Sequence, residues 1–280
     1  MKRLLFSLLA LGAGGCQSPA TTSPAARPEA AAQPTAAALP AAALLARDST
    51  AAVLALTQQV DLAPAWGNKT PDTKRYGALE GFYGPDNYRM SFYYDRVQQD
   101  ARQPNVFHVW GRDRYKRTIT PFTATLTVTR LASLPDTAGM TYGLPRPVRA
   151  YTAFATFTLR EDATTKGSGH CQGRAALDFY VVRSHQAEQL PADSGEVGAG
   201  NPTGGCGLLF QGTWQDNQSG RQQPVAWANY YGVIVPEALA KLGLGMRSEE
   251  VDPRLARYGW NTIMENDEWW AKSPTPAVSF

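Results

Sequence analysis

A regular alternation of apolar and polar residues most constrains how this chain can fold. It is clearest in Thr118–Leu131, where every second residue from Phe122 to Val128 is apolar and the residues between them are threonines. A period of two places apolar side chains on one face of a β-strand and polar side chains on the other. The same alternation returns in Val148–Arg160 and in Gln172–Arg183. The chain is therefore expected to form a sheet with one buried and one solvated face.

Eight segments have this strand character, and turn residues such as Gly, Pro, Asp and Asn separate most of them. They are Tyr76–Tyr83, Asn87–Val97, Asn105–Arg112, Thr118–Leu131, Val148–Arg160, Gln172–Arg183, Gly207–Trp214 and Pro224–Val233. Sequential antiparallel strands without intervening helices form a meander, and eight strands can close into a barrel. We predict an all-β fold of about eight antiparallel strands, barrel-like or calycin-like. A two-sheet β-sandwich is the alternative.

Short helices are expected at both ends of this domain. Asp48 or Ser49 can cap a helix that continues to Val60. Near the C-terminus, Pro236–Leu242 and Ser248–Tyr258 begin with residues typical of helix N-termini. Between the first helix and the first strand, the prolines and glycine of residues 62–72 predict a loop.

Three tryptophans, Trp260, Trp269 and Trp270, lie within eleven residues of the C-terminal tail. Large aromatic side chains of this kind are expected to cover a sheet face or a barrel end. An exposed aromatic platform for a sugar or a protein partner is the alternative.

The first 15 residues have the features of an export signal. Lys2 and Arg3 form a basic end, Leu4–Leu11 is an apolar run, and small residues precede Cys16. The segment resembles a bacterial lipoprotein signal, with Ala13 in place of the usual leucine. That resemblance implies that Cys16 carries the lipid, palmitate included, and becomes the mature N-terminus. An ordinary secretory signal with a chance cysteine is the alternative.

Residues 16–48 are rich in Ala, Pro and Thr and cannot bury enough apolar area to fold by themselves. We therefore expect a tether between the lipid and a single β-rich domain in residues 49–280. The formal charge of +3 falls to about +1 once Lys2 and Arg3 are removed, since each carries one positive charge. No dense Lys/Arg tract follows, so a nucleic-acid partner is not expected.

With Cys16 assigned to the lipid, Cys171 and Cys206 remain. An even pair of cysteines in an exported protein predicts a disulfide. The prediction conflicts with one arrangement of the sheet. If the strands that follow the two cysteines are antiparallel neighbours, the cysteines lie at opposite ends of the sheet unless the long loop Ser184–Gly205 runs back along the barrel.

The sequence contains no recognisable catalytic or metal-binding motif. None of His108, His170 and His185 has metal-ligand spacing, and no C-x-x-C is present, so we expect no metal and no other cofactor. Ser168 does not lie in a G-x-S-x-G motif. A carbohydrate-active hydrolase would need two facing carboxylates. The acidic residues on or beside strands that could supply them are Glu80, Glu161, Asp162 and Asp178.

Aromatic residues on the strands are the better functional clue, because Tyr and Trp accept apolar ligands and offer a polar tip. We expect a ligand site inside the barrel or at its mouth. The candidate residues are Tyr88, Phe92, Tyr94, His108, Trp110, Trp214 and Trp227. A filled core without a cavity is the alternative.

Several segments resemble a group of uncharacterised lipoproteins from Bacteroidetes-type bacteria: LEGFYGPDNYRMSFYY, VWGRDRYKRTITPF, GRAALDFYV, LLFQGTWQD and ARYGWNT. The resemblance covers about Tyr76–Trp270. It implies a β-rich, calycin-like or barrel-like extracytoplasmic domain, and its motifs are structural rather than catalytic.

Together these features predict a protein anchored by lipid in the cell envelope, at the outer membrane, that binds rather than catalyses. The expected ligand is a small apolar molecule or a glycan. A structural or protein-interaction lipoprotein with a filled core is the main alternative, and a carbohydrate-active hydrolase is a further one.

Overall fold

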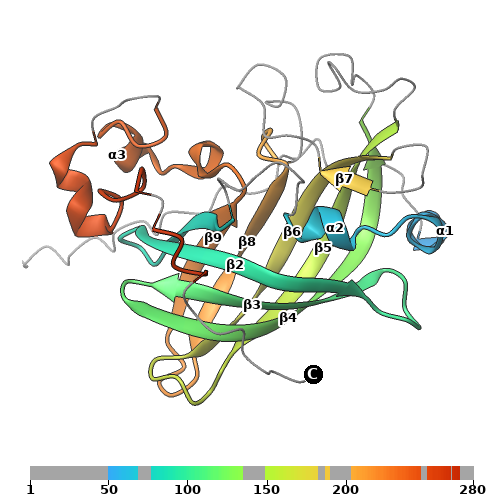
Figure 1. Ribbon diagram of the computed structural model, residues 1–280, viewed down its shortest axis with the longest axis horizontal. Helices are drawn as coiled ribbons and strands as arrows, with labels where there is room; N and C mark the ends of the chain where they lie inside the picture. Colours follow the sequence, from blue (N-terminus) through green and yellow to red (C-terminus); the bar gives the residue numbers. More distant parts are fainter. Residues whose placement is uncertain are drawn as a thin grey trace, which may run out of the picture. The chain divides into compact units, whose positions relative to one another are not determined.

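In the computed structural model, which describes residues 50–68, 77–134, 149–181, 187–189, 203–246, 251–265 and 267–271, eight antiparallel strands close into a β-barrel (Figure 1). The strands are β1 (Leu79–Tyr83), β2 (Tyr88–Gln99), β3 (Val106–Tyr115), β4 (Thr118–Ser133), β5 (Arg149–Glu161), β6 (Gly169–Val181), β8 (Leu208–Asp216) and β9 (Gln222–Ala228). The all-β, eight-stranded prediction is confirmed, and the sandwich alternative is wrong.

The barrel is a meander whose ends meet. Strands β1 to β6 pair in chain order, and the wall closes from β6 through β8 and β9 back to β1. A short strand, β7 (Ala187–Gln189), pairs with β6 at Phe179–Val181, beyond the point where β8 begins opposite Leu177. Closure pairs both edges of every barrel strand, which removes the edges that promote aggregation.

The threonine alternation of β4 has the predicted effect. Phe122, Leu126 and Val128 point into the barrel and are buried, while the threonines between them are partly exposed on the outside. Strand β5 continues the pattern, because Thr125 lies opposite Thr158 in the antiparallel register. Bulges in β2 and β4 shift the register locally, and such irregularities bend a strand and increase its twist.

Two helices close one end of the barrel, which we call the plugged end (Figure 1). Helix α1 (Thr50–Gln59) packs on β4, and helix α2 (Ala63–Trp66) packs on β2, β6 and β7. Leu62 and Trp66 are buried in the same apolar cluster as the barrel interior. Helix α1 was predicted. Helix α2 lies in the segment expected to be a loop, and burial of its apolar face overrides the turn chemistry of the sequence.

After β9 the chain forms short helical segments on the outside of the barrel. They are η2 (Tyr231–Ile234), α3 (Glu237–Ala240) and η3 (Pro253–Tyr258). Their apolar side chains form a second cluster around Trp260, whose ring lies 4.6 Å from that of the outward-pointing Phe82. The expected helical tail is therefore present, although helix-like structure in the second segment begins at Pro253 rather than at Ser248, which lies outside the described residues.

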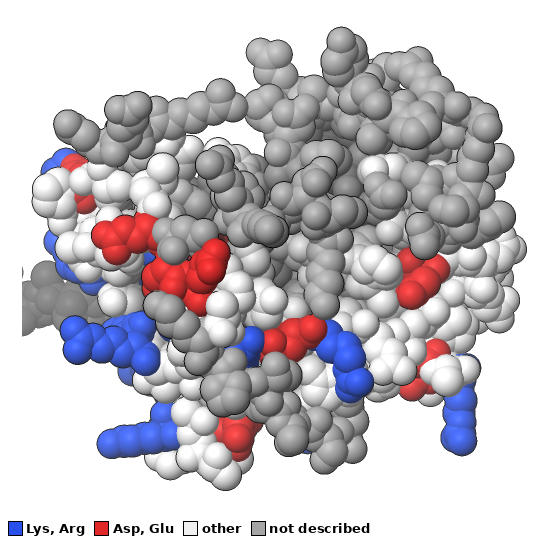
Figure 2. Space-filling view, viewed as in Figure 1, with Lys and Arg blue, Asp and Glu red and all other residues white. Residues whose placement is uncertain are grey.

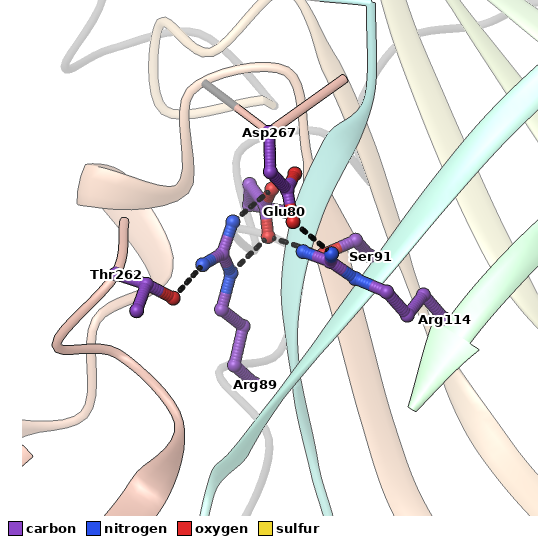
Figure 3. Close-up of polar contacts among 6 residues, drawn as sticks. All are labelled: Glu80, Arg89, Ser91, Arg114, Thr262 and Asp267. Carbon is purple, nitrogen blue, oxygen red and sulfur yellow. Dashed lines mark hydrogen bonds and ion pairs between the residues drawn. The ribbon is translucent and has the colours of Figure 1, made fainter. Parts of the chain in front are cut away.

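Polar contacts attach this tail to β1, β2 and β3 (Figure 3). Arg89 donates to both carboxylate oxygens of Glu80, at 2.7 and 2.8 Å, and also reaches Thr262 at 3.3 Å. Arg114 pairs with Asp267. The fork of hydrogen bonds between Arg89 and Glu80 is the strong, bidentate kind of ion pair.

The tail tryptophans lie against the barrel wall. Trp260 and Trp269 are buried, and Trp270 stacks on Tyr93 with 5.5 Å between ring centroids. The expectation that they cover a sheet face is confirmed, and the alternative of an exposed platform is wrong for Trp260 and Trp269.

Candidate functional site

The barrel interior is a packed aromatic core. Trp227 lies between Phe92 and Phe210, with ring centroids 4.1 and 4.8 Å away. Its Nε1–H donates to the Tyr94 hydroxyl at 2.9 Å, so both buried polar tips have a partner. A cavity of about 10 Å³ lies among these rings, which is the lower limit for a single water molecule. The cavity among these rings is therefore too small for an apolar ligand.

The structure separates the candidate aromatic residues into three groups. Four side chains point inward, and the alternative of a filled core applies to them: Phe92, Tyr94, Trp214 and Trp227. Tyr88 lies at the rim, with its ring edge-on to Tyr115 at 5.3 Å. His108 and Trp110 lie on the outside of the wall.

The interpretation of Trp110 as an interior residue is therefore wrong. Phe107 and Val109 are the buried, inward residues of β3, and strand alternation sends His108 and Trp110 to the opposite face. On that face the Arg96 guanidinium carbon lies 3.6 Å from the centroid of the Trp110 ring. His108 bonds to the Asp100 carboxylate at 2.9 Å.

The end of the barrel opposite the plug contains two buried acids, and we call it the carboxyl end. Asp113 on β3 is 1 % exposed, and Glu161 at the end of β5 is 8 % exposed. The two side chains hydrogen-bond to each other. Glu161 also accepts hydrogen bonds from Trp214 Nε1, at 2.9 Å, and from the backbone N–H of Gly169, at 2.6 Å.

Burial raises the pKa of both carboxyl groups, because it disfavours the charged form. The pKa of Asp113 is raised well above its ordinary value, since the neighbouring charge of Glu161 adds to desolvation. The hydrogen-bond donors around Glu161 favour its charged form and oppose the shift. We therefore assign the shared proton to Asp113, which donates it to the Glu161 carboxylate.

Other groups at the carboxyl end are also held neutral. Burial raises the pKa of the Tyr83 hydroxyl, and burial together with the two carboxyl groups raises the pKa of the Cys171 thiol. The Tyr83 ring packs on Trp214 at 5.3 Å. Within the described residues, one oxygen of Asp113, Oδ2, has no hydrogen-bond partner.

This pair does not have the geometry of a glycoside hydrolase. Such an enzyme places its carboxyl groups about 5 Å or more apart, on either side of a bond that the substrate brings between them. Asp113 and Glu161 instead bond to each other beneath Trp214. The other candidate acids are elsewhere: Glu80 pairs with Arg89, Asp162 bonds to Thr164 in a turn, and Asp178 bonds to Thr152 outside the barrel. In the described part of the chain, no group of three or more His, Cys, Asp or Glu residues could hold a metal ion.

The predicted disulfide is wrong, because Cys171 and Cys206 are both free and buried. Cys171 faces the interior from the start of β6, where it pairs with Trp214. Cys206 precedes β8 and packs outside the wall with Leu209 and Ala228. The two cysteines therefore lie at opposite ends of neighbouring antiparallel strands and also on opposite sides of the wall.

Two other predicted features lie outside the described residues: the signal in residues 1–15 with Cys16 after it, and the tether in residues 16–48. His185 also lies outside them. None of the helices that the structure describes is both long and apolar enough to cross a bilayer. Comparisons of the chain with protein-family models, curated proteins and solved structures found no match. The resemblance to a lipoprotein group thus stays a prediction.

Proposed function

We propose that this chain is a lipid-anchored protein of the cell envelope that binds its partner on the outer surface of a filled barrel, without catalysis. The packing of Trp227 between Phe92 and Phe210 carries the proposal. It supports the outer surface over the interior as the binding site, and it therefore favours a glycan or another partner that binds from outside the barrel. The two acids of the carboxyl pair are also buried, Asp113 at 1 % and Glu161 at 8 % exposure, which favours a role without catalysis.

The proposed anchor rests on the signal-like residues before Cys16 and on the Ala/Pro/Thr-rich segment that follows. A flexible segment of that composition would let the barrel reach partners at a distance from the membrane. We expect radioactive palmitate to label the wild-type protein and not the Cys16→Ser variant. The wild type should fractionate with the outer membrane. Equal labelling of both proteins would overturn the anchor.

A protein-interaction role with the same filled core is the second candidate. Two methionines on the C-terminal segments, Met246 and Met264, are 72 % and 69 % exposed. Flexible, exposed Met side chains are frequent on surfaces that bind other proteins. This candidate predicts that Met246→Ser and Met264→Ser together weaken a protein contact and leave glycan binding unchanged.

Native mass spectrometry tests the central point of the proposal. The mature chain with Cys16→Ser is incubated with an envelope extract and then desalted. We expect the mass of the bare chain, because the cavity among the core rings is too small for a ligand. A stoichiometric adduct with an apolar molecule, lost in the Trp227→Ala variant, would contradict the proposal and restore the interior site.

A further inference from the structure

We propose that the barrel binds an acidic polysaccharide on a face defined by Arg96, Trp110, Thr123, Thr158, Arg160 and Arg174, which we call the arginine face. The inference rests on the proposed function, and it adds the face of the barrel that binds and the chemical class of the ligand.

The strand register sets these residues side by side. Arg96 lies opposite Trp110, Trp110 opposite Thr123, and Thr123 opposite Arg160, on β2, β3, β4 and β5. Neighbouring strands are about 4.8 Å apart, so this row spans about 14 Å. That length suits an oligosaccharide segment better than a single sugar.

Two further rows run parallel to the first. One contains His108, Thr125, Thr158 and Gln172, and another contains Thr127, Thr156 and Arg174. All of these side chains point outward, because the residues between them belong to the interior cluster. Their hydroxyl and amide groups can both donate and accept hydrogen bonds, as the hydroxyl groups of a sugar require.

The charge of this face is one-sided. The three rows contain arginines and no Asp or Glu, and the side chains of Arg96, Arg160 and Arg174 are exposed. The acids that border this face are already hydrogen-bonded, Asp95 to Arg112, Asp100 to His108 and Asp162 to Thr164. No carboxylate among the described residues pairs with the three arginines. The face therefore complements an anion.

The type of anion follows from the remaining chemistry. A guanidinium group binds a carboxylate or a phosphate through two parallel hydrogen bonds, and Trp110 holds the Arg96 guanidinium against its ring.

Protein interfaces usually have an apolar core, but the exposed large apolar residues of the described chain, such as Met246 and Tyr230, are not on these rows. Nucleic acid needs a denser basic surface. On the side drawn in Figure 2, basic side chains lie singly or in small groups.

Polygalacturonate, a linear polyuronate, is a suitable probe, and dextran is the neutral control. The mature chain with Cys16→Ser is titrated with each. We expect it to bind polygalacturonate and not dextran, and to bind less tightly as NaCl is raised from about 0.05 to about 0.5 M, because salt screens exposed charges. The triple variant Arg96→Gln, Arg160→Gln, Arg174→Gln should bind at least about tenfold more weakly.

A matched control removes three positive charges elsewhere: Lys241→Gln, Arg254→Gln and Arg257→Gln. It should bind polygalacturonate within about twofold of the wild type, since these charges are on the C-terminal segments. An equal loss in both triple variants would overturn the arginine face, because net charge alone would explain the binding. Absence of polygalacturonate binding by the wild type would overturn it as well.

The same variants separate this inference from the proposed function. Immobilised wild type and the arginine triple variant are exposed to an envelope extract, and retained polysaccharide is measured. Retention by both proteins would overturn the arginine face and leave the proposed outer-surface binding in place. Retention by the wild type alone supports both. If neither retains polysaccharide or protein, the proposed function fails too.

Discussion

The two ends of the barrel are closed by opposite means. At the plugged end, Leu62 and Trp66 place apolar side chains on the aromatic core. At the carboxyl end, Asp113 and Glu161 occupy interior positions and hydrogen-bond to each other. Apolar burial closes the first end, whereas the second end also buries an acid pair that shares a proton.

This difference makes the two ends respond differently to pH. Burial of apolar groups is insensitive to pH. A carboxyl group with a raised pKa keeps its proton in the folded protein at pH values where the unfolded chain has lost it. Its contribution to stability is therefore complete below the ordinary pKa of about 4, and it is lost as the pH rises through the folded pKa.

The largest expected effect is at the plugged end. Trp66→Ala removes a fully buried ring and should lower the free energy of unfolding by about 3–5 kcal/mol. Chemical unfolding should give the same loss at pH 5 and at pH 8. Trp66→Phe is the control and should cost much less, because Trp66 Nε1 has no hydrogen-bond partner among the described residues. If the loss of unfolding free energy differed between pH 5 and pH 8, the proposed difference between the plugged end and the carboxyl end would be wrong.

The next effect is at the carboxyl end. For the wild type, the free energy of unfolding should fall between pH 5 and pH 8, by at most about 1.4 kcal/mol per pH unit for each proton. Asp113→Asn should remove most of this slope, because the amide donates to Glu161 without titrating. The Tyr83 hydroxyl and the Cys171 thiol contribute little, because the ordinary pKa values of tyrosine and cysteine are about 10 and about 8.5, and both groups are therefore mostly neutral in the folded and the unfolded chain below pH 8.

Urea unfolding at several pH values measures that slope. The control is Glu237→Gln, which removes an exposed acid of α3 that pairs with Lys241, and its slope should equal that of the wild type. A slope that survives in Asp113→Asn would show that the pair does not titrate in this range.

Glu161→Gln should change the free energy of unfolding by less than Trp66→Ala does, and by less than the pH-dependent change that Asp113→Asn is expected to remove. Trp214 Nε1 and the Gly169 N–H donate to different oxygens of Glu161, and an amide offers only one oxygen. One buried donor loses its partner, at a cost of about 1–3 kcal/mol. Thermal unfolding followed by tryptophan fluorescence measures the loss. A cost near zero would mean that the region rearranges to satisfy both donors.

Much of the fold could be predicted because the period-two pattern is local. In β4, each outward threonine indicates that the next residue points inward. Patterns of this kind predict the eight strands and their order along the chain. Helix α2 could not be read this way, since Pro64 and Gly67 are typical of a loop and only burial of Trp66 reveals the helix. Strand β7 has three residues within a polar loop, too few for a periodic pattern.

The candidate site was harder to predict than the fold. Its residues differ in whether they face the inside or the outside of the barrel, and residue type does not show this. In β3, Phe107, Val109 and Trp110 are all large and apolar, and their composition does not distinguish inside from outside. Continuing the alternation from Phe107 through Gly111 would have placed Asp113 inside the barrel. Its partner Glu161 could not be found in this way, since the pairing depends on how β3 and β5 face each other across the closed barrel.

The smallest effect on stability is expected from the cysteines, which are free at opposite ends. Reductant should change neither the intact mass nor the thermal midpoint. In a Cys16→Ser background, Cys206→Ala leaves Cys171 as a reporter of the carboxyl end. Cys171→Ala leaves Cys206, just before the start of β8, as a reporter of the plugged end.

Both thiols are buried, and burial raises both pKa values, that of Cys206 to about 12, so maleimide labels them only when the structure opens locally. The ratio of the Cys171 rate to the Cys206 rate cancels the general increase of thiolate with pH. That ratio should rise as the pH increases above the ordinary carboxyl pKa of about 4, because opening of the carboxyl end releases the proton that the folded pair holds. Asp113→Asn should abolish the rise. A constant ratio would mean that the two ends open together, and that the proton on Asp113 does not control one end alone.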